Sequence, residues 1–174
     1  MKKNSRRKQL SQHKTEPKPR FFDLLSRGTQ ALQNGDIARA VSLLERAHQL
    51  DPDNPDAALN LGGVYILAKK FAQAVAILEP LRERDPDNPM VWTNLGAAYL
   101  GNSVLAGDEK QQRAIAAFER ALTINPATPN VAYNLGLIYL ARREHERALG
   151  WFKRAVQTNP DDRDALNYIR QLGR

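Results

Sequence analysis

Apolar residues recur along the chain at helical spacing rather than in the alternation expected of a strand. Leu61, Val64 and Ala68 lie three or four positions apart, so they would share one face of a helix. Just before them, Asn54-Pro55 is typical of a helix start, because asparagine can cap free N–H groups and proline suits the first helical position. The pattern returns several times, and it therefore predicts a series of amphipathic helices joined by short turns.

The pattern is also periodic. Each unit closes with a proline, and the four prolines are spaced by 34, 40 and 34 residues. Three units carry a Leu-Gly dipeptide, and a tyrosine follows each of these glycines by three residues. A glycine inside a helix costs about 1 kcal/mol relative to alanine. Its recurrence at the same position therefore needs a packing reason, and it predicts that the two helices of each unit approach closely. A fixed period of this length indicates a solenoid of stacked units. The markers are Pro52, Pro86, Pro126 and Pro160; Leu61-Gly62, Leu95-Gly96 and Leu135-Gly136; and Tyr65, Tyr99 and Tyr139.

The third unit holds the fullest set of markers. It reads Trp92-x2-Leu95-Gly96-x2-Tyr99, then Ala114-x3-Phe118, then Pro126. This pattern resembles the tetratricopeptide repeat (TPR) motif, and the resemblance extends over residues 21–174. It implies an all-α, right-handed superhelical solenoid of about four helix-turn-helix hairpins followed by a C-terminal capping helix. The expected repeats are about residues 21–54, 55–88, 89–128 and 129–162, with the capping helix at 163–173.

Two features depart from the regular pattern. The third unit is six residues too long between Tyr99 and Ala114, which predicts a longer turn between its helices. This turn is either a tolerated surface insertion, since longer loops cost little entropy, or a projecting contact built on Val104 and Leu105. Pro80 falls inside the second helix of the second unit, where it removes a backbone hydrogen bond and predicts a bent or split helix.

The charge of the chain is concentrated at its N-terminus. The net charge is +7, from 26 basic and 19 acidic residues, and residues 1–20 contain eight bases and one acid. Residues 21–174 therefore carry 18 charges of each sign. With few apolar residues, residues 1–20 are predicted to be a disordered tail. The tail is either a basic arm for nucleic acid, a ribosome or another anionic surface, or a solvated segment without a ligand. Its clustered bases are Lys2, Lys3, Arg6, Arg7 and Lys8.

Several classes of chemistry are excluded by composition. The chain has no cysteine, so disulfides, zinc–thiolate sites and cysteine nucleophiles are impossible. Its three histidines share no metal-ligand spacing, and no phosphate-binding glycine loop or nucleophile elbow occurs. No apolar run is long enough to span a bilayer, and no secretory leader is recognisable. We therefore expect a cytoplasmic protein that is not an enzyme and has no cofactor or metal.

The family resemblance implies where a partner would bind. In TPR proteins the first helix of each unit lines a concave groove that holds a peptide or helix of a partner protein, so we expect a protein-binding scaffold. Asparagine offers a donor and an acceptor, so it can bond an extended backbone. We predict a groove for an apolar segment, with an acidic neighbour near Arg170. The predicted groove residues are Asn60, Asn94, Asn134 and Asn167; Leu25, Leu59, Thr93, Tyr133 and Leu137; and Arg163 and Arg170.

Two variations on this function follow from the same positions. Family members that clamp a partner's C-terminal carboxylate use lysine and arginine on these faces, whereas here the places hold Leu25, Thr29, Met90 and Asn130. This departure argues against a carboxylate clamp. The first unit has Arg27 in place of the usual leucine and begins without a preceding helix. We therefore expect a monomer, or weak self-association through that face.

Overall fold

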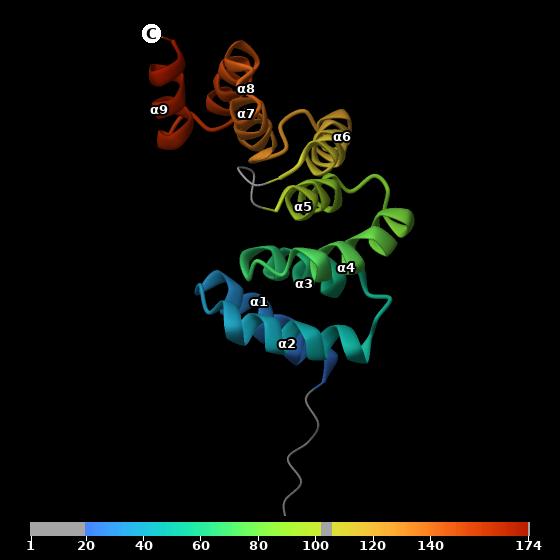
Figure 1. Ribbon diagram of the computed structural model, residues 1–174. Coiled ribbons are helices and arrows are strands. Elements are labelled where there is room, and N and C mark those ends of the chain that lie inside the picture. Colours follow the sequence, from blue (N-terminus) through green and yellow to red (C-terminus); the bar gives the residue numbers. More distant parts are fainter. Residues whose placement is uncertain (1–19, 102–105, 174) are drawn as a thin grey trace, which may run out of the picture.

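The computed structural model describes residues 20–101 and 106–173, which form nine α-helices and no strand. Figure 1 shows the helices stacked pair after pair into an elongated array, with α9 at one end. This arrangement confirms the predicted all-α solenoid of four hairpins and a final helix. The helices are α1 (Phe21–Gln33), α2 (Ile37–Leu50), α3 (Pro55–Leu67), α4 (Phe71–Arg84), α5 (Pro89–Leu100), α6 (Asp108–Ile124), α7 (Val131–Ala141), α8 (His145–Thr158) and α9 (Arg163–Leu172).

Asparagine caps start two of the first helices, as predicted. The Oδ1 atom of Asn54 accepts a hydrogen bond of 3.1 Å from the backbone N–H of Ala57. Asn88 likewise accepts from the N–H of Met90 at 3.0 Å. In both cases a proline follows the cap at the first helical position. These caps satisfy N–H groups that have no partner within the helix.

The first helix of the fourth unit begins two residues after Pro129, where that unit was expected to begin. Helix α7 begins at Val131, after Asn130 in a left-handed conformation with φ of +63°. Thr128 is buried, and its hydroxyl donates a hydrogen bond of 2.6 Å to the carbonyl of Asn125. Its side chain therefore serves the end of α6 and is not available to cap α7.

Glycine residues, which have no side chain, allow the two helices of a hairpin to pack closely. A Cβ atom built on Gly62 would lie 2.5 Å from Leu78 Cδ2, and one on Gly96 would lie 2.6 Å from Phe118 Cε1. Both neighbouring side chains are fully buried. The recurring glycine is thus required by the close approach of the facing helix, which outweighs its cost in helix propensity.

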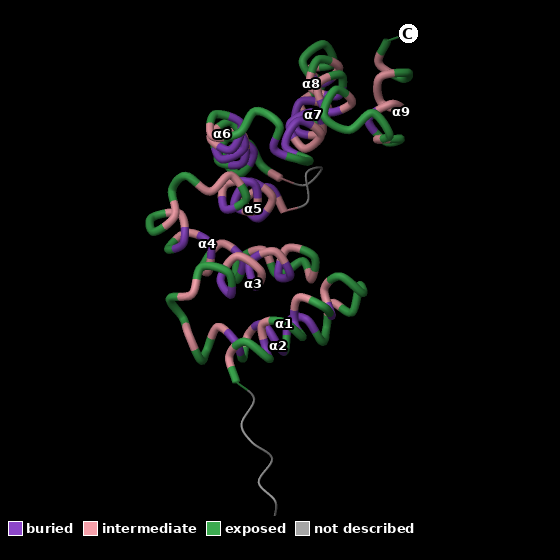
Figure 2. Tube along the Cα trace, turned by 180° about the vertical axis from the view of Figure 1, so that it is seen from behind, coloured by how far each residue is buried: buried purple, intermediate pink, exposed green. Residues whose placement is uncertain are grey.

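The buried side chains form a core that runs along the stack. One cluster joins residues of α1 to α6, and a second joins residues of α5 to α9. Trp92 and Tyr99 pack against both clusters, so the two are connected through the third unit. Figure 2 shows buried segments on all of the helix pairs, which is the pattern of stacked units that each cover a neighbour.

Helix α4 is not split by Pro80. It is one continuous helix from Phe71 to Arg84, so the alternative of two separate helices is wrong. Its last turns are inclined to the first ones in Figure 1, as expected where proline removes one backbone hydrogen bond. The extra residues of the third unit do lie between α5 and α6, but Val104 and Leu105 fall outside the described residues.

The two ends of the solenoid differ from its interior. On α1, Asp23 and Arg27 form an ion pair of 3.1 Å at the register where α3 buries Ala57 and Leu61. At the other end, α9 packs on α8 and places the Tyr168 ring in a stack on Phe152, with centroids 4.6 Å apart. The α1 end of the solenoid thus carries an ion pair where interior units have apolar residues, whereas helix α9 covers the other end.

Candidate partner-binding groove

The first helices of successive hairpins form one continuous face. Helix α3 contacts both α1 and α5, and a Cβ atom on Gly63 would lie 3.6 Å from Asn94 Nδ2. Helix α7 follows α5 in the array, and Ala97 on α5 packs against the cluster to which residues of α7 also belong. The predicted groove residues of α1, α3, α5 and α7 therefore lie along one side of the stack.

Three asparagines occupy the same register of successive units. Asn60, Asn94 and Asn134 are all half-buried and lie two positions before the packed glycines. Asn60 Nδ2 donates a hydrogen bond of 2.9 Å to the carbonyl of Asp56 within its own helix. The ladder thus has the spacing of the solenoid and keeps part of each amide at the surface.

The proposed fourth member of the ladder is out of register. Asp162 caps α9 by accepting a hydrogen bond from the N–H of Ala165 at 2.9 Å, just as Asn54 caps α3 through Ala57. Counting from these caps places Tyr168, not Asn167, at the register of Asn60. Asn167 lies one position earlier. The ladder consequently ends in a tyrosine.

The same count moves Arg170 away from the line of the groove. Arg170 takes the register of Gly62, which in a complete hairpin faces the second helix. Its guanidinium donates hydrogen bonds to Asn167 Oδ1 and, over 3.4 Å, to the carbonyl of Leu166. Arg163 is exposed on the first turn of α9. An acidic neighbour held at Arg170 would therefore lie beside the groove and not within it.

Thr93 also offers less than predicted. Its side chain is buried, and its hydroxyl donates a hydrogen bond of 2.8 Å to the carbonyl of Pro89.

Tyr133 is partly buried between Phe152 and Tyr168, at ring distances of 5.8 and 6.4 Å. Burial, foremost, raises the pKa of the Tyr133 phenol, with Tyr168 adding to the shift. Tyr133 is therefore as much a packing residue as a groove residue.

The first helices of the hairpins carry exposed apolar side chains. The described residues include four exposed large apolar side chains, and three of them belong to the row of first helices: Phe22 at 76%, Leu67 at 59% and Met90 at 43%. Leu67 lies four and eight positions after Gly63 and Leu59, on the same side of α3. Half-buried Leu25, Leu59 and Leu137 lie beside them. Sequence reasoning missed Phe22 and Leu67, although the spacing of eight residues from Leu59 could have found Leu67.

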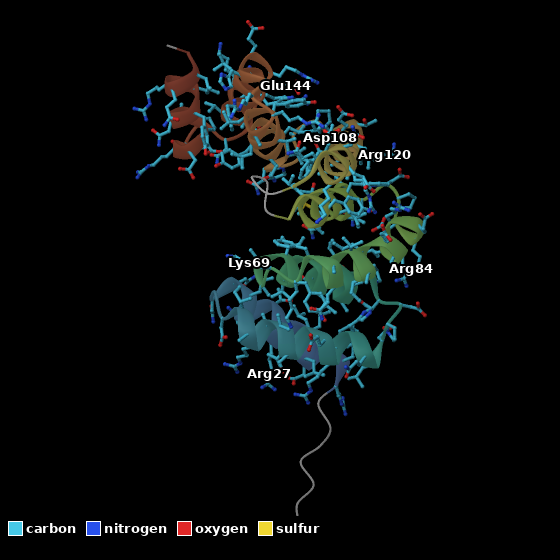
Figure 3. All side chains as sticks on the ribbon, in the orientation of Figure 1. Arg27, Lys69, Arg84, Asp108, Arg120 and Glu144 are labelled. Atoms are coloured by element: carbon cyan, nitrogen blue, oxygen red, sulfur yellow. The ribbon has the colours of Figure 1, made fainter. Side chains whose placement is uncertain are left out.

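Charge lies mainly elsewhere. No residue of the row from Leu25 to Leu137 in the predicted groove set carries a charge. Ion pairs instead join neighbouring units at the connections between hairpins, where Arg84 bonds Asp53 at 2.8 Å and Arg120 bonds Asp87 at 3.1 Å. Figure 3 shows Arg84 and Arg120 on the same side of the molecule, opposite Lys69. The predicted groove residues on α1, α3, α5 and α7 are thus apolar or neutral polar.

The structure offers little for other kinds of site. Within residues 20–101 and 106–173, no group of three or more metal-ligating side chains comes together. In the same ranges, no helix combines the length and apolar character that a membrane span requires. The clustered bases from Lys2 to Lys8 lie outside the described residues.

Comparison with known proteins gives one consistent family. Two models of the tetratricopeptide repeat match residues 31–98 and 103–163, and together they span most of the chain. Among solved structures, the TPR protein TTC0263 of Thermus thermophilus is 22% identical with a TM-score of 0.76, over 88% of this chain and 81% of that one. No curated protein matches the sequence.

Two further structures share the fold. MamA (41-end) from Desulfovibrio magneticus RS-1 is 23% identical with a TM-score of 0.69, over 84% of this chain and 79% of that one. A chain of the APC/C hetero-tetramer Cut9-Hcn1 is 21% identical with a TM-score of 0.74, and 87% of this chain aligns with 29% of that one. At these identities the likeness concerns the fold alone. The repeat motifs, the stacked hairpins and both family models agree that this chain belongs to the tetratricopeptide repeat family.

Proposed function

We propose that the chain is a non-enzymatic adaptor that holds an apolar peptide or helix of a partner protein in the groove along α1, α3, α5 and α7. Repeat solenoids of this family are in general scaffolds for protein–protein interaction, and their extended inner faces are suited to it. The observation that carries the proposal is the exposure of Phe22, Leu67 and Met90 on this one face. Exposed apolar side chains that gather on one face are typical of interaction sites.

The energetics favour an apolar partner. Fully covering a large apolar side chain is worth about 1.5–3 kcal/mol, and three such side chains are exposed here. Part of this gain offsets the entropy lost on association. The neutral amides of Asn60, Asn94 and Asn134 can bond a partner backbone without requiring a charge. A segment with a continuous apolar side and few charges therefore fits the groove best.

A matched pair of variants tests the proposal. Leu67 and Leu50 are exposed to similar extents, 59% and 57%, but Leu50 ends α2, a second helix of its hairpin, and does not belong to the row of first helices. Leu67→Glu would place a carboxylate in the apolar contact, so the partner captured from native lysate should be lost or bound at least about tenfold more weakly. Leu50→Glu should retain it.

Two results decide between the groove and the basic N-terminus. Retention of the same protein by both variants at equal affinity would refute the groove. Binding through the N-terminal bases, the alternative function, would instead survive Leu67→Glu, be lost on removal of residues 1–19, and weaken steeply with salt. Nuclease treatment of the captured material then shows whether a nucleic acid carried it.

A further inference from the structure

A hollow of about 390 Å³ lies away from the groove, between the second and third units. Its floor is apolar and includes Phe71 and Val75 from α4 and Leu100 from the end of α5. Tyr99 forms part of the wall, and two bases, Lys110 and Arg113 from α6, line it as well. None of the predicted groove residues lines the hollow.

Gly101, which follows the last residue of α5, is one of the residues that line the hollow. Helix α5 ends at Leu100, and the next residue, Gly101, has a φ of +58°, which residues with a side chain rarely adopt. A Cβ atom at Gly101 would already lie 3.4 Å from Phe71 Cδ2. The corresponding position of the second unit is Leu67, which has a large side chain. A side chain at position 101 would therefore contact Phe71, which also lines the hollow.

The arginine beside the hollow is held in place. The Arg113 guanidinium lies 4.0 Å from the centre of the Tyr99 ring and donates a hydrogen bond of 2.9 Å to Glu79 Oε1. The Tyr99 hydroxyl donates to the same oxygen at 2.9 Å. Burial, foremost, and this bond raise the pKa of Tyr99, so its phenol stays neutral. Arg113 is therefore preorganised, at a low entropy cost to a ligand.

The charge of the lining is one-sided. Lys110 is exposed on the first turns of α6 and forms no ion pair with another described residue. No carboxylate is among the described residues that line the hollow. Glu79 forms an ion pair with Arg113 at 2.9 Å, so the net positive charge beside the hollow is carried by Lys110. An incoming group at this rim therefore meets a net charge of +1 beside apolar lining residues.

We propose that this hollow is a second docking site, which takes a bulky aliphatic side chain of a partner protein segment whose next residue is aspartate or glutamate. Its volume falls at the small end of ligand pockets, about 300–1,000 Å³, and so suits a side chain better than a cofactor. The apolar lining accommodates the aliphatic group, and Lys110 attracts the neighbouring carboxylate. The site would let the adaptor engage a partner, or a second partner, outside the groove.

Short capped peptides test the site on the full chain. The probes are Ac-Gly-Leu-Asp-Gly-NH₂, its Leu-Lys counterpart and its Ser-Asp counterpart, each titrated into ¹⁵N-labelled protein. The Leu-Asp peptide should shift the amides of Ala72 and Gly101 saturably, with an affinity at least about threefold above that of the other two peptides. The amides of Gly63 and Ala97 report on the groove and should stay unshifted.

Two variants separate the charge from the cavity. Lys110→Glu should reduce the preference for Leu-Asp over Leu-Lys at least about threefold, whereas Lys153→Glu, the same charge change on exposed α8, should leave it unchanged. Ala72→Trp should fill the mouth and abolish the shifts, with an unchanged helical signal confirming the fold. The proposal is overturned by shifts confined to the groove amides, by equal binding of Leu-Lys, or by no saturation at about 20 mM peptide.

Discussion

The packed glycines offer the sharpest test of how the hairpins are built. Gly96 on α5 and Gly150 on α8 both lie inside helices and can both be changed to alanine. In an isolated helix the two substitutions should be equally favourable, by about 1 kcal/mol each. Their environments differ, because Gly96 faces another helix and a Cβ atom at Gly150 would meet no atom within 4 Å.

The expected magnitudes have opposite signs. The new Cβ of Gly96→Ala would lie 2.6, 2.7 and 2.9 Å from three ring carbons of Phe118, which is fully buried. Overpacking of this kind costs about 1–3 kcal/mol, and three close contacts with a rigid ring favour the upper end. After the gain in helix propensity, Gly96→Ala should destabilise the protein by about 2 kcal/mol. Gly150→Ala should stabilise it by about 0.5–1 kcal/mol.

Urea unfolding followed by circular dichroism measures both variants in the same way. A shift of the midpoint with an unchanged slope reports a change in stability alone. The double variant Gly96→Ala/Phe118→Leu should lose less stability than the sum of its single changes, because the smaller side chain makes room for the methyl group. Equal effects of Gly96→Ala and Gly150→Ala, or an additive double variant, would refute the packing argument.

Three further predictions concern titration and the open end. Burial, foremost, and the hydrogen bond to Glu45 raise the pKa of Tyr65 to about 12. The stability from this group is therefore full below about pH 10 and lost as the pH rises toward 12, and melting curves of Tyr65→Phe should show a weaker alkaline fall. Burial, then Arg84, lowers the pKa of His48, whose buried Nδ1 has no hydrogen-bond partner among the described residues. The contribution of neutral His48 to stability is present above about pH 6.5 and is lost as the pH falls through the lowered pKa. The NMR titration midpoint of the His48 imidazole should therefore lie below the ordinary value of histidine. Replacing the ion pair by Asp23→Ala/Arg27→Leu should give the first unit an apolar end that stacks on another copy, and sedimentation should then become concentration-dependent where the parent chain's is not.

Signals in the sequence were sufficient to predict those features for which a side chain had only one favourable contact. The period of 34 residues, the helical spacing of Leu61 and Val64, and the caps at Asn54 and Asn88 predicted the order and type of the helices. The groove side followed from the register of the packed glycine, since neighbouring positions on a helix are fixed by its geometry. The caps and the helical spacing each depend on residues within a turn or two of one helix, which is why the sequence alone could predict them.

Tertiary contacts decided the features for which a side chain had more than one possible partner. Thr128 could cap α7 or bond the end of α6, and burial against α6 favoured the second. The cap at Asp162 moved Asn167 out of the ladder, because register is counted from where a helix begins. The hollow beside Arg113 required α4, α5 and α6 to meet around Gly101. A sequence pattern shows which side of a helix is apolar. The distance to the next helix depends on close packing and on whether every buried polar group finds a hydrogen-bond partner. Both conditions involve residues far apart in the sequence, so they are met only in the folded chain.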